Sequence, residues 1–114
     1  MFDFQKLSVY NKAKQFAIEI TSFIKHNNFD RTTNDQLRRA SFSIMLNIAE
    51  SSSRFSNKDR RNFLVISRGS SFECVAILEY LNDIDSISDE AYQKYYLELE
   101  TISKMLYALI KKLS

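Results

Sequence analysis

Residues 36–54, QLRRASFSIMLNIAESSSR, carry the clearest fold signal in this chain. Apolar side chains recur there at intervals of three or four residues, which is the spacing of one face of an α-helix. That face comprises Leu37, Ala40, Ile44 and Ile48. Further apolar side chains leave only a narrow polar strip, and they are Phe42, Met45, Leu46 and Ala49. A helix that packs once needs an apolar arc of little more than about 100°, so this segment predicts a second packing partner.

The next segment, 57–83, has the same surplus and holds the only glycine of the chain. Its helical wheel predicts a core seam of Phe63, Ser67, Ser70, Cys74, Ile77, Leu81 and Ile84. A second stripe, well round the helix, comprises Val65, Gly69, Phe72, Ala76 and Tyr80. Glycine inside a helix costs about 1 kcal/mol relative to alanine, so Gly69 requires a packing reason. Two reasons stay open, namely close approach by a neighbouring subunit or packing within the subunit.

The surplus apolar surface of both segments predicts an interface between subunits. Its candidate residues are Phe42, Met45, Val65, Gly69 and Phe72.

Two outer segments, 9–23 and 89–113, also repeat apolar residues every three or four positions. Start signals separate the helices: a capping box from Thr33 to Gln36, then Ser56 or Asn57, then Ser88. Asparagines 27 and 28 indicate the end of the first helix.

Four helices joined by short links predict an all-α, antiparallel up-and-down four-helix bundle, with residues 1–114 forming one domain. The alternative is an open array of helices that another chain completes. The chain has no proline, one cysteine, no long apolar run and no signal-like N-terminus. We therefore expect a cytoplasmic protein that does not enter a membrane.

Candidate catalytic groups are few. His26 is the only histidine, at a helix end, and Cys74 lies on the apolar seam, where a buried and unreactive thiol is expected. The sequence lacks a phosphate-binding loop, a nucleophile elbow and paired Glu-x-x-His elements. It therefore predicts neither an enzyme nor a metal ion or other cofactor.

Four polar residues stand within the second and third helices: Arg39, Asn47, Glu50 and Glu73. We interpret them as a structural network that fixes helix register, with Arg39 or Arg54 as counter-charge. Acid–base chemistry by the two glutamates is the alternative, but no nucleophile accompanies them.

In an up-and-down bundle, the link between the second and third helices lies at the same end as both chain termini. That end collects the candidate nucleic-acid-binding residues Arg54, Lys58, Arg60, Arg61, Lys111 and Lys112. Lysine and arginine bind phosphates by charge. Two functions stay open: a ribonucleoprotein scaffold that binds RNA or DNA, and a protein-interaction adaptor whose charges serve solubility.

Segments 36–54 and 63–73, with KLSVYNKA at 6–13 and MLYALIKKL at 105–113, resemble a family of four-helix-bundle proteins encoded in intervening sequences of bacterial large-subunit ribosomal RNA. The chain departs from that pattern at Met45, Ser51 and Tyr10, where the family has proline, glycine and often tryptophan. The resemblance implies a homopentamer. It also implies kinship with the accessory variability proteins of diversity-generating retroelements, which bind nucleic acid and a reverse transcriptase.

Overall fold

The computed structural model describes residues 1–27 and 29–114. These residues form a short 3-10 helix, Asp3–Lys6, followed by four α-helices and no strand. The helices are α1 (Ser8–Lys25), α2 (Arg31–Ser52), α3 (Asn57–Asp83) and α4 (Asp89–Lys112). The predicted all-α class is confirmed.

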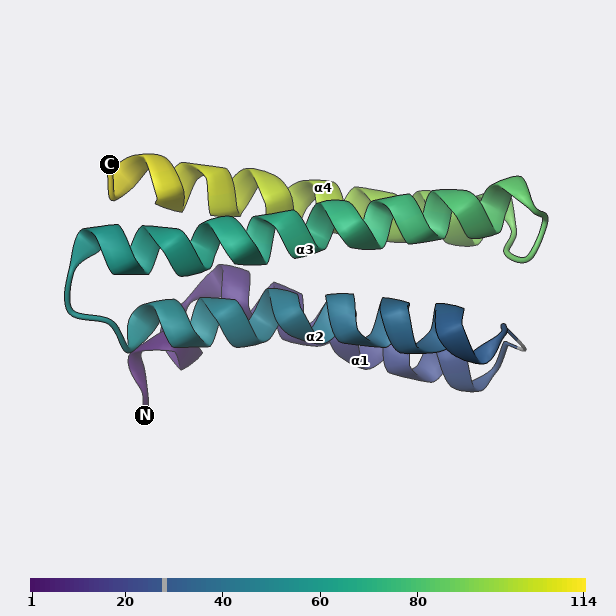
Figure 1. The fold of residues 1–114 in the computed structure, drawn as a ribbon, viewed down its shortest axis with the longest axis horizontal. Coiled ribbons are helices and arrows are strands. Elements are labelled where there is room, and N and C mark those ends of the chain that lie inside the picture. The colour runs from purple at the N-terminus through teal and green to yellow at the C-terminus, as the bar shows by residue number, and fades with distance from the viewer. Residues whose placement is uncertain (28) are drawn as a thin grey trace.

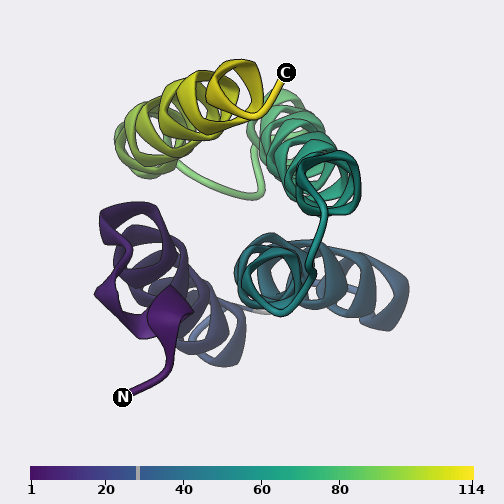
Figure 2. The same ribbon diagram turned by 90° about the vertical axis from the view of Figure 1, so that its left-hand side faces the viewer.

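The four helices run alternately up and down along a body of 44 × 24 × 21 Å (Figure 1). Each helix packs on its neighbour in the chain, and α1 closes the bundle against α4 (Figure 2). Both chain termini and the α2–α3 link lie at one end, as the topology predicts (Figure 1). The α1–α2 and α3–α4 links lie at the other end.

Side-chain caps explain where three helices begin. Ser56 and Ser88 accept hydrogen bonds from the backbone N–H groups of Asp59 and Ala91, which confirms the Ser88 cap and selects Ser56 over Asn57 for α3. The predicted Thr33 cap of α2 is wrong. Asp30 caps this helix, and its side chain accepts a hydrogen bond from the Thr33 N–H at 2.9 Å. Thr33 lies inside the first turn of the helix, where its hydroxyl also donates to Asp30 at 2.9 Å.

Two local features mark where α1 and α3 end, at the end of the bundle opposite the chain termini. Helix α1 stops at Lys25, and the Asn27 side chain donates to the Phe23 carbonyl at 2.8 Å; the other asparagine proposed as a terminator, at position 28, lies outside the described residues. Helix α3 ends in a Schellman arrangement, in which the Ser86 N–H donates to the Leu81 carbonyl at 2.8 Å. Asp85 takes the left-handed position there, with φ of 60°.

One apolar core runs through the bundle between all four helices. The predicted face of α2 is buried as expected, from Leu37 to Ile48. The predicted seam of α3 is partly wrong, since Ile84 is exposed and Phe63 and Ile77 are only half-buried. Their places are taken by Leu64, Ser71 and Leu78. Helix α3 packs against both α2 and α4, so its buried arc is wider than a single seam and is rotated toward α4.

None of the helices in the described part of the chain is long and apolar enough to cross a membrane.

Candidate nucleic-acid interface

The basic end is the part of the bundle where the α2–α3 link meets the two chain termini (Figure 1). Lys58 stands in the first turn of α3, and Lys111 and Lys112 stand in the last turn of α4. All three are exposed, and Arg61 is half-exposed. Within residues 1–27 and 29–114, none of these four cations forms an ion pair. Their charges are therefore available to an anionic ligand.

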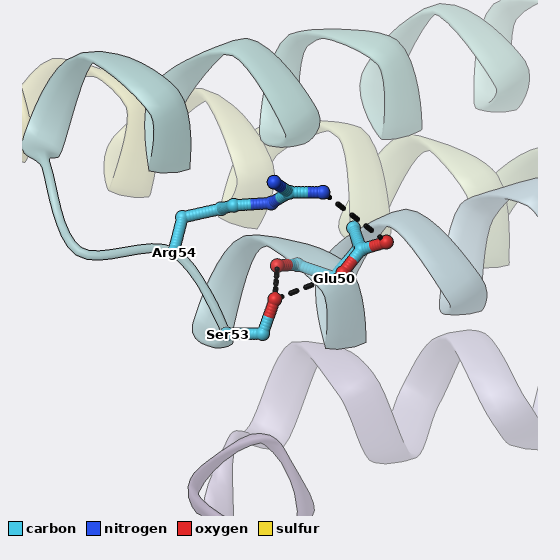
Figure 3. Close-up of polar contacts among 3 residues, drawn as sticks. All are labelled: Glu50, Ser53 and Arg54. Atoms are coloured by element: carbon cyan, nitrogen blue, oxygen red, sulfur yellow. Dashed lines mark hydrogen bonds and ion pairs between the residues drawn. The ribbon is translucent and has the colours of Figure 1, made fainter.

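The Arg54 side chain contacts other residues of the bundle, among them Glu50 (Figure 3). Its Nη2 lies 3.4 Å from Glu50 Oε1, and its guanidinium carbon lies 4.5 Å from the centre of the Phe63 ring. Glu50 is in turn held by the Ser53 hydroxyl, which donates to Oε2 at 2.8 Å. Arg54 thus fastens the end of α2 to the start of α3, and part of its charge is neutralised.

Arg60 is engaged too, although it makes no ion pair among the described residues. Its Nε donates to the Arg54 carbonyl at 2.7 Å. Its own carbonyl accepts from the buried Ser51 hydroxyl at 2.8 Å. Sequence reasoning treated Ser51 only as a departure from a family pattern, whereas its hydroxyl joins α2 to α3. The link is therefore a fixed structure, and the free cations stand around it.

The predicted polar network does not form as one unit. Asn47 donates to the Ser43 carbonyl at 2.8 Å, and Glu50 pairs with Arg54. Arg39 and Glu73 are exposed and make no side-chain hydrogen bond or ion pair with the described residues. The helix register explains this result. Since residue 51 lies beside residue 60, and 43 beside 70, Glu50 and Glu73 are separated by about 18 Å along the helix axis.

Serines make the polar contacts between α2 and α3 instead. Ser67 donates to the Ile44 carbonyl at 2.7 Å in the core, and Ser70 donates to the Ser43 hydroxyl at 2.7 Å. Small hydroxyl side chains let the two backbones approach closely and still satisfy their own polar groups. The sequence signal was the serine-rich run of α3, which had been assigned to the apolar seam without a bonding role.

The candidate interface residues divide into two groups. Phe42, Val65, Gly69 and Phe72 are exposed, whereas Met45 is half-buried against the core and contributes less to the surface than predicted. A Cβ atom on Gly69 would meet nothing within 4 Å. Packing within the subunit therefore does not explain Gly69, and that alternative is wrong.

A shallow groove of about 430 Å³ runs beside this stripe, between α3 and α4. The Arg68 guanidinium lies there, 4.8 Å from the Phe72 ring centre and 5.4 Å from that of Tyr107. Its Nε donates to the Ser103 carbonyl at 3.3 Å. The apolar stripe is thus continuous with an aromatic groove on the outer surface of the bundle.

Other titratable groups lie away from the basic end. Cys74 is buried as expected, and burial raises the pKa of its thiol to about 12. His26 Nδ1 lies 2.8 Å from the Ser22 carbonyl. On the α1–α4 seam, burial and the nearby Glu19 carboxylate raise the pKa of Glu98 to about 7. Among the described residues, no three histidine, cysteine or acidic side chains are grouped so as to hold a metal ion.

The fold and this end together define an all-α, up-and-down four-helix-bundle protein with a fixed link surrounded by free cations. The chain belongs to the family described as "23S rRNA-intervening sequence protein", whose profile matches residues 5–108. The resemblance seen in the sequence is confirmed at this level.

One solved structure gives the same fold. It is described as a protein with unknown function from the S23 ribosomal protein family, from Bacteroides thetaiotaomicron, and it is 28% identical to this chain. The TM-score is 0.86, over 90% of this chain and 98% of that one. Among curated proteins, none matched this sequence.

Proposed function

We propose that this protein is a non-enzymatic oligomer that binds RNA or DNA through its basic end and acts as a ribonucleoprotein scaffold. The observation that carries the proposal is the gathering of Lys58, Arg61, Lys111 and Lys112 at one end of the bundle, where the described residues neutralise none of them. Asp3 and Asp59 also lie at this end, so binding should be moderate and salt-sensitive.

Oligomerisation is part of the proposal. The stripe of Val65, Gly69, Phe72, Ala76 and Tyr80 on α3 is exposed, and a Cβ atom on Gly69 would meet no described atom within 4 Å. A homopentamer is the form that the family resemblance implies, and it would repeat the basic end five times. The same resemblance suggests a reverse transcriptase as partner. The single cysteine favours the cytoplasm as location. An adaptor without nucleic-acid binding is the second candidate, because the same apolar stripe and groove could receive another protein.

A binding titration separates the two candidates. The test variant is Lys58→Glu/Arg61→Glu, because Arg60 and Arg54 are tied into the link and their replacement would disturb the fold. The matched control is Lys25→Glu/Arg31→Glu, which makes the same change in net charge at the opposite end. Wild type and control should bind single-stranded RNA with an affinity that falls steeply with salt.

The test variant should bind more weakly, and loss of two phosphate contacts should make the negative slope of log K against log salt shallower by about 1.4. Undetectable binding of the wild type at low salt, or equal loss in both variants, would favour the adaptor. Light scattering checks the oligomer separately, and a monomer at micromolar concentration would reject it.

A further inference from the structure

Phe55 is the most exposed large apolar side chain of the described residues, with a relative exposure of 101%. It stands in the α2–α3 link, between Arg54 and the Ser56 cap. The neighbouring residues are fixed: the Arg54 N–H donates to the Ser51 carbonyl at 3.2 Å, and Arg60 Nε donates to the Arg54 carbonyl at 2.7 Å. An ordered backbone therefore holds this ring in solvent.

Phe63 presents a ring face beside the link, and Arg54 covers it at 4.5 Å. Phe55, the next residue in the chain, covers nothing. Single exposed apolar residues are ordinary on protein surfaces. Phe55 differs from these because its ring is completely exposed, on an ordered link and at the same end as the cations that form no ion pair with the described residues. The ring and the cations together complement one class of ligand.

That ligand is a single-stranded nucleic acid. Proteins that bind single strands combine a positive surface along the backbone with aromatic rings on which unpaired bases stack. Lys58 and Arg61 flank the link on α3, and Lys111 and Lys112 lie at the same end of the bundle. The bases of a duplex are already stacked on one another, so an exposed aromatic ring does not increase the affinity for a duplex.

We propose that Phe55 is a stacking platform for an unpaired base, with Lys58 and Arg61 on the adjacent phosphates. This inference rests on the proposed function and specifies its ligand as a single strand with little sequence preference. A phenyl ring has no group that reads a base edge or a ribose hydroxyl. Single-stranded RNA and DNA should therefore both bind.

The chain contains no tryptophan, so Phe55→Trp creates a unique fluorescent probe at the platform. Titration with oligoadenylate should quench it as bases stack. The matched control is Leu97→Trp on α4, away from the basic end, which is also 57% exposed and should keep its fluorescence. Phe55→Ala and Phe55→Leu should each weaken single-strand binding on the order of tenfold, because neither has an aromatic face. Both should leave the thermal unfolding midpoint unchanged, since the ring touches nothing.

Each contrary result has a distinct meaning. If Phe55→Ala binds like wild type while Lys58→Glu/Arg61→Glu loses binding, the platform is wrong and the basic end stands. Equal affinity of wild type for a duplex and a single strand overturns the platform too. A change in oligomer size with unchanged binding assigns Phe55 to a protein contact and overturns it. If the wild type binds no nucleic acid at low salt, the inference and the proposed function fail together.

Discussion

The Ser67 hydroxyl donates a 2.7 Å hydrogen bond to the Ile44 carbonyl across the α2–α3 interface, with both residues fully buried. This contact fixes the two helices in register at the middle of the bundle. It also satisfies a hydroxyl that would otherwise be costly in the core.

Ser67→Ala should lower the free energy of unfolding by about 1 kcal/mol, which is the usual net value of one hydrogen bond. Ser67→Val should cost more, about 1–3 kcal/mol, because the helices are too close for added methyl groups. The control is Ser71→Ala, since Ser71 is equally buried but bonds only to the Arg68 carbonyl of its own helix. Urea unfolding measures all three. If Ser71→Ala costs as much as Ser67→Ala, the cross-helix bond has no special role.

Gly69→Ala should raise the free energy of unfolding of the dilute chain by about 1 kcal/mol, because alanine favours helix and its Cβ meets no atom within 4 Å. In the proposed oligomer the same methyl group should weaken association, so its effect should reverse at high protein concentration. Ala76→Gly, on the same exposed stripe, should destabilise the dilute chain by about the same amount. Urea unfolding over a range of concentrations, with light scattering, makes the measurement. Destabilisation of the dilute chain by Gly69→Ala would contradict the open surroundings of this glycine.

Asp85→Gly should stabilise the protein by roughly 0.5–1 kcal/mol, because Asp85 holds the left-handed position of a Schellman motif, where glycine has no steric cost. Asp85→Val should destabilise it, since a β-branched residue fits that conformation poorly. Thermal unfolding compares the two. A fall in melting temperature for Asp85→Gly would show that the carboxylate itself stabilises this turn.

The stability of the bundle should fall as pH rises from about 4.5 to about 7. Burial, and then the charge of Glu19, raise the pKa of Glu98 from the ordinary 4.5 to about 7. Between these values the folded chain binds a proton that the unfolded chain has lost, so the contribution is complete below 4.5 and absent above 7. Glu98→Gln should flatten this dependence and stabilise the protein at pH 8.

Glu19, the neighbour of Glu98, titrates outside that pH window. Burial acts to raise the pKa of Glu19, but hydrogen bonds with Lys94 and Glu98 outweigh it and lower the pKa. Lys94 Nζ lies 2.8 Å from Glu19 Oε1. The stabilising effect of Glu19 is therefore lost only as pH falls below its ordinary range, outside the window of Glu98. Glu100→Gln, on the exposed face of α4, should leave the profile between pH 5 and 8 unchanged. A flat wild-type profile there would contradict the raised pKa of Glu98.

The fold was predictable because each helix carries a strong apolar repeat and short links connect the helices. The buried face of α2 is the clearest case, since Leu37, Ala40, Ile44 and Ile48 of its three-four repeat are all buried. The α3 seam was predicted less well because Ser67, Ser70 and Ser71 give little contrast between neighbouring stripes. Phe63 and Leu64 differ by one position, or about 100° round the helix, and only packing against α4 decides between them.

The candidate interface was predictable in position but not in detail. Topology alone brings the α2–α3 link to both chain ends. The topology does not predict that Arg54 covers the Phe63 ring while Phe55 stays in solvent, because the sequence does not distinguish which of the two neighbouring side chains packs there. The importance of Ser51 was hidden for a similar reason, since its partner is a backbone carbonyl nine residues away.

Since both termini emerge beside the α2–α3 link, any polypeptide joined to either end of this chain will share the space around Phe55, Lys58 and Arg61. A purification tag placed there would compete with a ligand, and an acidic tag would imitate one. A fluorophore is better attached through the exposed side chain of residue 86, in the α3–α4 link at the far end of the bundle.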